Sequence, residues 1–277
     1  MSHNPAIGRF LSVDPLTKSY PELTPYQFAS NRPIDGIDLD GLEYDDSKLR
    51  IIRRTGTNVL QVEGQIDVKV KIINLSSQSK IPSDVQKFHE LKSSNTFDIE
   101  SAFTISTVIP IDPITGEKNI PAKKYRVEAK KIDINFEFIG VYNSLSELDK
   151  GDVALLLVDE IPGADKKGDS VGRSELGGVV YAVESKYFLD KSHTDTHEKG
   201  HLIGGMMDWK AEDGAKKGYL MSYVDDGSGY NLRLADRRNL IIEILDRKGL
   251  NVSDNMDENT DTKKRAEDFI KKNNIDD

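Results

Sequence analysis

The sequence contains no cysteine and only five histidines among its 277 residues. The absence of cysteine excludes disulfides and thiolate metal sites. No apolar run approaches the roughly 18 residues that a membrane-spanning helix needs, so we expect no membrane span. The N-terminus also lacks the apolar core of a signal peptide, so we expect any export to be carried by something else.

An excess of basic residues is absent as well, since the formal net charge is −9. Nucleic-acid-binding proteins normally present a basic face, so this charge argues against a nucleic-acid partner and weakens assignment as a nuclease. Hydrophobic residues make up 37% of the chain and charged residues 31%. That composition is sufficient for a sizeable core with polar extensions.

The most informative stretch is 196–204, which contains the pattern His-Glu-x-x-His. Residues four apart lie on one face of a helix, so His197 and His201 can point their imidazoles at one metal ion. Glu198 follows the first histidine, where its carboxylate can take a proton from a water at the metal. The alternative interpretation is a solvated helix face that happens to carry two histidines.

A second signal follows about twenty residues later, in Gly218–Tyr223. His-Glu-x-x-His-x-x-Gly followed by Met-x-Tyr resembles the metzincin clan of zinc endopeptidases. The resemblance implies that Gly204 breaks the active-site helix and that Met221 forms a floor beneath the metal. It also implies that Tyr223 helps to stabilise the oxyanion, and that 231–245 is the clan's C-terminal helix. Tyr223 is almost as well explained as a non-catalytic tyrosine.

The third metal ligand departs from the clan's pattern. The usual ligand falls three residues after the glycine, and that position is Met207, whose thioether is a poor zinc ligand. We therefore predict that Asp208 is the third zinc ligand, displaced by one residue through a slightly longer turn. The rival candidates are His193, Asp213 and Asp225.

The fold expected from this resemblance is α+β, with a mixed twisted sheet, an active-site helix and a C-terminal helix. The sequence patterns before the motif predict a strand, a helix and then several strands, and the metal-binding helix follows them. The expected strands are 66–72, 125–142, 153–158 and 179–183, a helix is expected over 82–92, and 95–109 fits either helix or strand.

Three further expectations concern single features of this domain. We expect Val179–Val183 to be the sheet edge that pairs with substrate backbone. We expect His89 to be a surface histidine, and Trp209 to be a buried core residue rather than a platform for substrate.

Residues 1–42 are a different kind of sequence, dense in proline and glycine and without helical periodicity. With Gly8-Arg9-Phe10 and Asp14-Pro15, they resemble the end of the RHS-repeat-associated core of polymorphic bacterial toxins. The resemblance implies an enclosing RHS β-shell, a toxin domain after the junction, a cognate immunity protein, and a secreted or delivered effector acting in a target cell. The plainer interpretation is an extended leader.

The junction itself carries a candidate self-cleavage sequence. Family members often cut themselves after the Leu of Asp-Pro-x-Gly-Leu, using aspartates as the catalytic acids. Asp38, Asp40 and Leu42 occupy the matching stretch, but Leu39 replaces the proline. The alternative is that these acids merely shape a glycine turn.

The expected layout is therefore an RHS core segment over 1–42, a polar tether over 43–58, a metzincin-like zinc metallopeptidase domain over 59–250, and an acidic flexible tail over 251–277 with a possible short helix at 263–272. The expected function is a zinc-dependent endopeptidase toxin acting on a target-cell protein. A zinc amidase acting on cell-wall peptide and a catalytically degenerate partner-binding module are the alternatives.

Overall fold

The computed structural model describes residues 3–4, 9–10, 44–45, 48–99, 103–109, 111–113, 115, 117, 123–162, 171–223, 229–248, 250 and 261–275. Asp38, Asp40 and Leu42 of the expected self-cleavage junction lie outside these residues, as does Asp225. Among the described residues, no helix combines the length and the apolar character that crossing a membrane requires.

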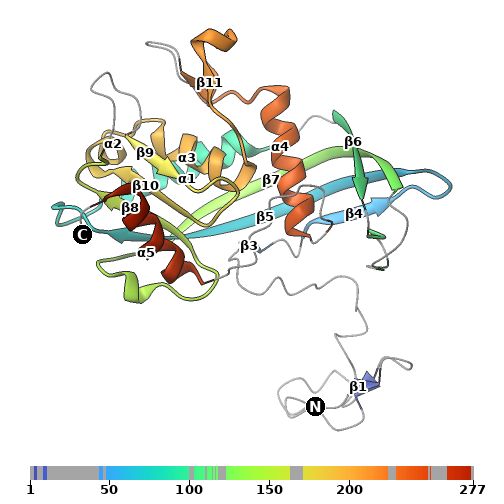
Figure 1. Ribbon diagram of the computed structural model, residues 1–277, viewed down its shortest axis with the longest axis horizontal. Helices are drawn as coiled ribbons and strands as arrows, with labels where there is room; N and C mark the ends of the chain where they lie inside the picture. The colour runs from blue at the N-terminus through green and yellow to red at the C-terminus, as the bar shows by residue number, and fades with distance from the viewer. Residues whose placement is uncertain are drawn as a thin grey trace.

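The described chain forms a mixed α+β fold (Figure 1). Its helices are α1 (Ser83–Phe97), α2 (Ser185–Leu189), α3 (Thr194–Gly204), α4 (Leu234–Arg247) and α5 (Thr262–Asn273). Its strands are β1 (His3–Asn4), β2 (Arg9–Phe10), β3 (Tyr44–Asp45), β4 (Arg50–Arg53), β5 (Val59–Asn74), β6 (Phe103–Ile109), β7 (Lys123–Tyr142), β8 (Val153–Val158), β9 (Gly172–Ser174), β10 (Val180–Glu184), β11 (Trp209–Lys210) and β12 (Ser222–Tyr223). Short 3-10 turns span Leu145–Glu147 and Ala211–Asp213.

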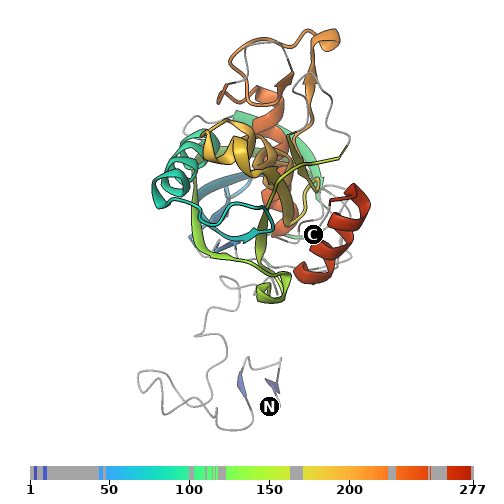
Figure 2. The ribbon, with the colours of Figure 1, turned by 90° about the vertical axis from the view of Figure 1, so that its left-hand side faces the viewer.

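An eight-stranded mixed sheet organises the molecule. Six of its strands follow the order β6-β7-β5-β8-β10-β9, and β3 and β4 pair with β5 outside this order. The neighbours β7, β5, β8 and β10 run parallel, whereas β6 and β9 are antiparallel to the strands beside them. The long strands β5 and β7 pair along most of their length, and β4, β3 and β8 share the other side of β5. Figure 2 shows that the sheet curls around the helices on one side.

Side chains alternate between the two faces of the sheet, and an apolar core lies on each face. In β8, Leu155 and Leu157 belong to the main core, whereas Ala154 and Leu156 belong to a smaller core on the opposite face. All six residues of β8 are buried, as expected for a strand covered on both faces. The main core includes residues of α1, α3 and α4, and the smaller core includes residues of α5 (Figures 1 and 2).

Several expected elements are present, with changed bounds. The predicted strands 66–72 and 125–142 lie within β5 and β7, and the helix predicted over 82–92 continues to Phe97. The ambiguous stretch 95–109 is divided between the end of that helix and β6. The predicted order of strand, helix, strands and metal helix is the observed one.

Three expectations differ from the structure. The segment expected to be a tether contributes β3 and β4, which pair with β5, because Leu49 is buried and its neighbours complete the ladder. The expected substrate-binding edge, Val179–Val183, is covered on its outer side by β9, so β9 is the edge. The short helix expected near the C-terminus forms as α5, and it packs on the sheet through Phe269 and Ile270 rather than lying free.

Candidate metal centre

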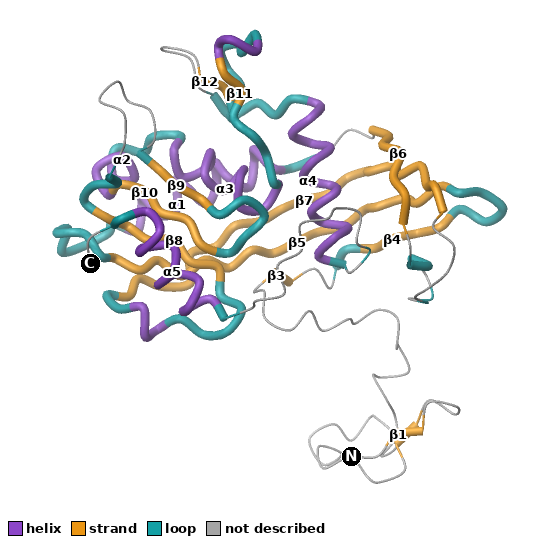
Figure 3. Tube along the Cα trace, viewed as in Figure 1, coloured by secondary structure: helices purple, strands orange, loops and turns teal. Residues whose placement is uncertain are grey.

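Helix α3 carries the His-Glu-x-x-His pattern into the interior of the protein. It packs between α1 and α4 on the side of the sheet that holds the main core (Figures 1 and 3). Ten of its eleven residues are buried, with His201 the one that is partly exposed. The predicted helix is therefore present, and its histidines do not belong to a solvated face.

Three side chains meet beside this helix in a compact triangle. His197 Nε2 lies 3.2 Å from His201 Nε2, and Asp208 Oδ1 lies 3.3 Å from the first nitrogen and 3.2 Å from the second. Three ligand atoms held tetrahedrally at zinc bond lengths of about 2.0–2.1 Å are about 3.3 Å apart. The three atoms therefore have the spacing of one face of a zinc coordination tetrahedron.

Both histidines are oriented by backbone carbonyls. His197 Nδ1 lies 2.8 Å from the carbonyl oxygen of Leu220, and His201 Nδ1 lies 2.6 Å from that of Met206. A carbonyl can only accept, so Nδ1 carries the proton in each ring and donates it. Each Nε2 then presents a lone pair to the centre of the triangle, as in known histidine metal sites.

The triangle is buried on one side and open on the other. The exposed fraction of the side chain is 6% for His197 and 16% for His201, but 36% for Asp208. Catalytic zinc sites hold the ion with three protein ligands and leave a position for water or substrate. The arrangement of these side chains fits that description.

Asp208 is the predicted third zinc ligand, and among the described candidates it is the one that lies beside the two histidines. In the described part of the chain, His197, His201 and Asp208 are the one group of three or more potential ligands close enough to share an ion. Neither His193 nor Asp213 belongs to it. Burial opposes ionisation of Asp208, but the two neighbouring imidazoles outweigh it and hold the pKa of this carboxyl well below its usual range.

Glu198 lies buried next to the histidines, against the edge strand β9. Its carboxylate lies over Gly172, where an added Cβ would overlap Glu198 Oε1 and force the glutamate side chain to shift. Burial raises the pKa of Glu198, which favours a carboxyl group able to hold a proton as well as release it. Neither Gly172 nor the proximity of β9 could be found by sequence reasoning, because a three-residue strand has no periodicity.

The turn after α3 explains why Asp208, and not Met207, reaches the triangle. Gly204 is the last residue of the helix, and Gly205 after it, whose φ of 51° is left-handed, is the residue that turns the chain. A Cβ at Gly204 would lie 2.6 Å from Met206 Cε, so a larger residue there would require the Met206 side chain to shift. Met206 turns into the core and Met207 turns out to solvent, so Asp208 is the next residue that can face the histidines.

Met221 lies beneath α3, where a floor was expected. A Cβ added at Gly200 would lie 2.8 Å from Met221 Sδ, so the methionine packs on the helix between the two histidines. Its side chain is completely buried. The same segment supplies the Leu220 carbonyl that orients His197, so it fixes both the floor and one ligand.

Tyr223 and Trp209 belong to two short strands that form a small projection beyond the helices and lie between α3 and α4 in the sequence (Figure 3). The two residues belong to β12 and β11, which pair in parallel. The structure describes the backbone of Tyr223 but not its side chain, so its oxyanion role stays a prediction. Trp209 is only partly buried, and Arg233 stacks 4.8 Å from its ring, so the expectation of a core residue is wrong.

His89 was expected at the surface, but its side chain is completely buried. Its ring stacks on Phe188 with centroids 4.1 Å apart, and Nε2 lies 2.8 Å from the Phe188 carbonyl oxygen. Nδ1 lies 3.6 Å from Asp195, which is more than a hundred residues away along the chain. The sequence could not show this partner, because His89 has no neighbouring apolar pattern that predicts burial.

His193 precedes α3 and makes stability depend on pH. Burial, followed by the positive charge of His197, lowers the pKa of His193 from 6.5 to about 4. The unfolded chain therefore holds more protons between these two values, so stability is full above pH 6.5 and is lost as pH falls to about 4. At about 1.4 kcal/mol per pH unit, the loss is about 3 kcal/mol at most.

We expect His193→Gln to reduce this pH dependence. Urea unfolding of the chelator-treated protein at pH 7 and pH 4 gives the two free energies for wild type and variant. The wild type should lose more stability than the variant between these values, with a difference of about 3 kcal/mol at most. Equal losses in the two proteins would contradict the assigned role of His193.

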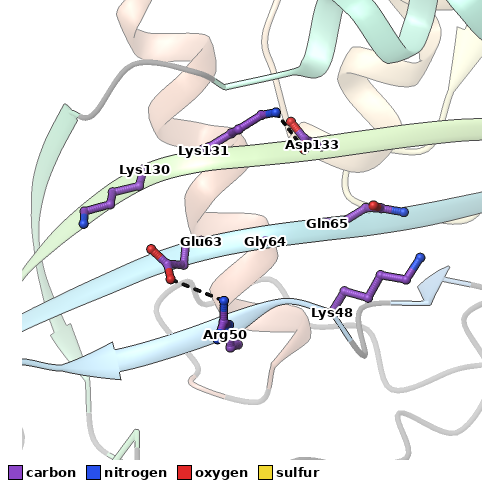
Figure 4. Close-up of a pocket in the computed structure, with 8 residues that line it drawn as sticks. All are labelled: Lys48, Arg50, Glu63, Gly64, Gln65, Lys130, Lys131 and Asp133. Carbon is purple, nitrogen blue, oxygen red and sulfur yellow. Dashed lines mark ion pairs between the residues drawn. The ribbon is translucent and has the colours of Figure 1, made fainter.

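A surface hollow lies elsewhere, over β4, β5 and β7 (Figure 4). It is lined by Lys48, Arg50, Glu63, Gly64, Gln65, Lys130, Lys131 and Asp133. Ion pairs join Arg50 to Glu63 and Lys131 to Asp133. None of the lining residues belongs to α3, β9 or the turn that carries Asp208, so this hollow is separate from the candidate metal centre.

Comparison with known proteins gives a structural likeness but no match by sequence. No family model matches the chain, and no curated protein matches it. Among solved structures, the chain is similar to an archaemetzincin from Methanopyrus kandleri, with a TM-score of 0.37 and 12% sequence identity. The similarity covers 64% of this chain and 95% of that one.

Proposed function

We propose that this chain is a zinc-dependent endopeptidase. The observation that carries the proposal is the triangle of His197 Nε2, His201 Nε2 and Asp208 Oδ1, with edges of 3.2–3.3 Å, next to the buried carboxylate of Glu198. Imidazole nitrogens and one carboxylate oxygen are a common ligand set of catalytic zinc. The absence of cysteine leaves nitrogen and oxygen ligands as the ones available.

The chemistry is divided between the metal and the protein side chains. Zinc held by His197, His201 and Asp208 would lower the pKa of a bound water towards about 7 and would polarise the scissile carbonyl. Glu198 takes the proton of the attacking water and later returns it to the leaving amine. We propose Tyr223 as the donor of a hydrogen bond to the oxyanion, in line with its place two residues after Met221.

The open edge of β9 suggests how a peptide is held. Glu175 N donates to Val180 O, and Glu184 N donates to Val171 O, so residues 171 and 175 direct their backbone groups towards β10. Backbone groups alternate in direction along a strand, so those of Gly172 and Ser174 point the other way. No described strand pairs there. We propose that an extended substrate adds to this edge, directly beside Glu198.

We expect Ser174→Pro to weaken peptide hydrolysis while leaving the metal site intact. Proline removes the outward N–H of an edge strand, a position where the fold tolerates it. One or two lost hydrogen bonds, at about 1 kcal/mol each, should lower kcat/KM by about 5- to 30-fold.

Ser174→Ala is the matched control for this variant. It removes the Ser174 hydroxyl that donates to Glu198 O at 3.0 Å but keeps the backbone N–H. Zinc content should be unchanged in both variants, and kcat/KM should fall only with proline. Equal kcat/KM values for the two variants would show that the substrate does not pair with β9.

The test of the proposed function is zinc content together with hydrolysis, before and after chelation. About one zinc per chain is expected, with cleavage of a denatured protein substrate that chelation abolishes and zinc restores. Cleavage of purified cell-wall peptide instead would identify the amidase alternative. A chain that takes up no zinc would overturn the proposal and leave a degenerate partner-binding module.

We further propose that the peptidase is the toxin of an RHS-type effector. Support comes from the resemblance carried by residues 1–42, and the implied partners are the enclosing β-shell and an immunity protein. Expression of residues 43–277 should arrest bacterial growth, and expression of the Glu198→Gln variant should not. Self-cleavage at Leu42 is tested by intact mass of the chain made with its shell, where an uncut product would exclude it.

A further inference from the structure

The orientation of α3 is not determined by its apolar residues. The helix sequence is Thr-Asp-Thr-His-Glu-Lys-Gly-His-Leu-Ile-Gly, in which Leu202 and Ile203 are the large apolar side chains. Ten of the eleven residues are nevertheless buried. A helix normally takes its rotation from an apolar stripe that faces the core. Most of α3 has no such stripe, so another interaction must fix which residues face the metal.

A buried ion pair lies on the side of α3 opposite to the histidines. Lys199 Nζ lies 2.8 Å from Asp195 Oδ2, and both side chains have 0% exposure. These two residues are four apart, as are His197 and His201, so the helix carries two such pairs. Lys199 is two residues from each histidine, roughly 200° around the helix axis. The ion pair and the candidate ligands therefore occupy opposite faces.

The pair is joined by directional contacts to the elements that surround α3. Asp195 Oδ1 accepts a hydrogen bond of 2.9 Å from the Tyr181 hydroxyl on β10. Lys199 Nζ donates to Ser93 Oγ on α1 at 3.1 Å. It also lies 4.8 Å and 4.6 Å from the ring centroids of Phe136 and Phe138 on β7.

These contacts do not extend to the metal face. They fix α3 to the sheet and to α1 at defined angles, whereas apolar contacts alone tolerate rotation. With side chains included, a helix has a radius of about 5–6 Å, so a rotation of about 20° moves a side-chain atom by about 2 Å. That displacement equals a zinc–nitrogen bond of about 2.0–2.1 Å. A small rotation would therefore separate the histidines from Asp208.

We propose that Asp195 and Lys199 are positioning residues for the metal centre: their buried pair fixes the rotation of α3 and so holds His197 and His201 towards Asp208. The inference rests on the proposed zinc function. Buried ion pairs are costly to desolvate and often add nothing to stability relative to apolar pairs. Their best-attested use is to specify one arrangement among several, and α3 is a helix that needs such a specification.

Two double variants of the full chain distinguish the directional hydrogen bonds of the Asp195–Lys199 pair from its charges. Asp195→Leu with Lys199→Met replaces the pair by apolar side chains of similar size. Asp195→Asn with Lys199→Gln removes both charges but keeps groups that can donate and accept hydrogen bonds. Single substitutions leave an unpaired buried charge and risk unfolding, so both members are replaced together.

Lys71→Met with Asp152→Leu is the matched control. Lys71 on β5 and Asp152, just before β8, form a second buried pair, in which Lys71 Nζ lies 2.7 Å from Asp152 Oδ2.

The measurements are zinc affinity by competition with a chelator, the visible spectrum of the cobalt-substituted protein, and thermal unfolding of the metal-free chain. We expect the apolar variant to fold, to bind zinc about 10- to 100-fold more weakly and to show an altered cobalt spectrum. Losses of this size are typical when residues that orient metal ligands are substituted. The amide variant should stay within about 3-fold of wild type, and so should the Lys71 control.

An apolar variant with wild-type zinc affinity and cobalt spectrum would overturn the inference while leaving the zinc function standing. Equal losses of affinity in the apolar and amide variants would also overturn it, because charge rather than direction would then be responsible. A wild-type chain that binds no zinc would overturn the proposed function and this inference together.

Discussion

Glu198→Gln should abolish peptide hydrolysis while the protein keeps its zinc. Glutamine has the size of glutamate and fills the same buried space over Gly172, but it cannot accept the proton of the attacking water. General-base catalysis contributes about 10²–10⁴-fold to hydrolytic rates, so kcat should fall by about that factor. Zinc content and thermal stability should match wild type, because Glu198 is not one of the three grouped ligand atoms.

Glu243→Gln is the matched control for that variant. Glu243 is a partly buried glutamate on α4, and burial raises its pKa as it does that of Glu198. Its carboxylate lies near Gly205, just beyond the end of α3, and it does not belong to the grouped ligands. The control should hydrolyse peptide at the wild-type rate. If Glu198→Gln also retained that rate, Glu198 would not be the base.

Asp208→Asn should cost the protein most of its zinc affinity. Structural zinc sites bind with about 10–16 kcal/mol, so one ligand in four accounts for roughly 3 kcal/mol, or about 100-fold in the dissociation constant. The carboxylate also supplies the negative charge of the site. Hydrolysis at limiting zinc should fall in parallel and recover in part when zinc is added in excess.

Asp213→Asn provides the comparison within the same loop. Asp213 is exposed, and its backbone carbonyl, not its carboxylate, accepts the Trp209 indole hydrogen bond of 3.0 Å. Zinc affinity should therefore be unchanged in this variant. If zinc affinity fell with Asp213→Asn and not with Asp208→Asn, Asp213 would be the third ligand. The loop would then have a different conformation in the zinc-bound protein.

The parts of the site that depend on helical spacing were predictable from the sequence. His197, Glu198 and His201 follow from the period of one helix, and Asp208 follows from the poor ligand properties of the thioether at Met207. The exact helix end did not follow, because Gly204 and Gly205 are adjacent glycines and only the structure shows which one is left-handed.

Contacts between distant segments were beyond such reasoning. The carbonyls of Leu220 and Met206 orient the histidines, and backbone atoms have no signature in a sequence. The edge strand β9 is three residues long, too short for alternation to be recognised. His89 is buried because Asp195 and Phe188 surround it, and neither partner is visible from its own neighbourhood.

The docking of α5 has a consequence for the time course of synthesis. Thr262 Oγ1 donates to Asp152 O at 2.9 Å, and Arg265 Nη2 lies 3.0 Å from Glu175 Oε2 in the turn that joins β9 to β10. Both contacts span about ninety residues or more. Until residues 262–273 leave the ribosome, the apolar row of β8 and β10 that faces α5 has no cover, so a nascent chain stalled before α5 is prone to self-association. The turn that follows the edge strand β9 is thus tied in place by a segment that is translated about ninety residues later.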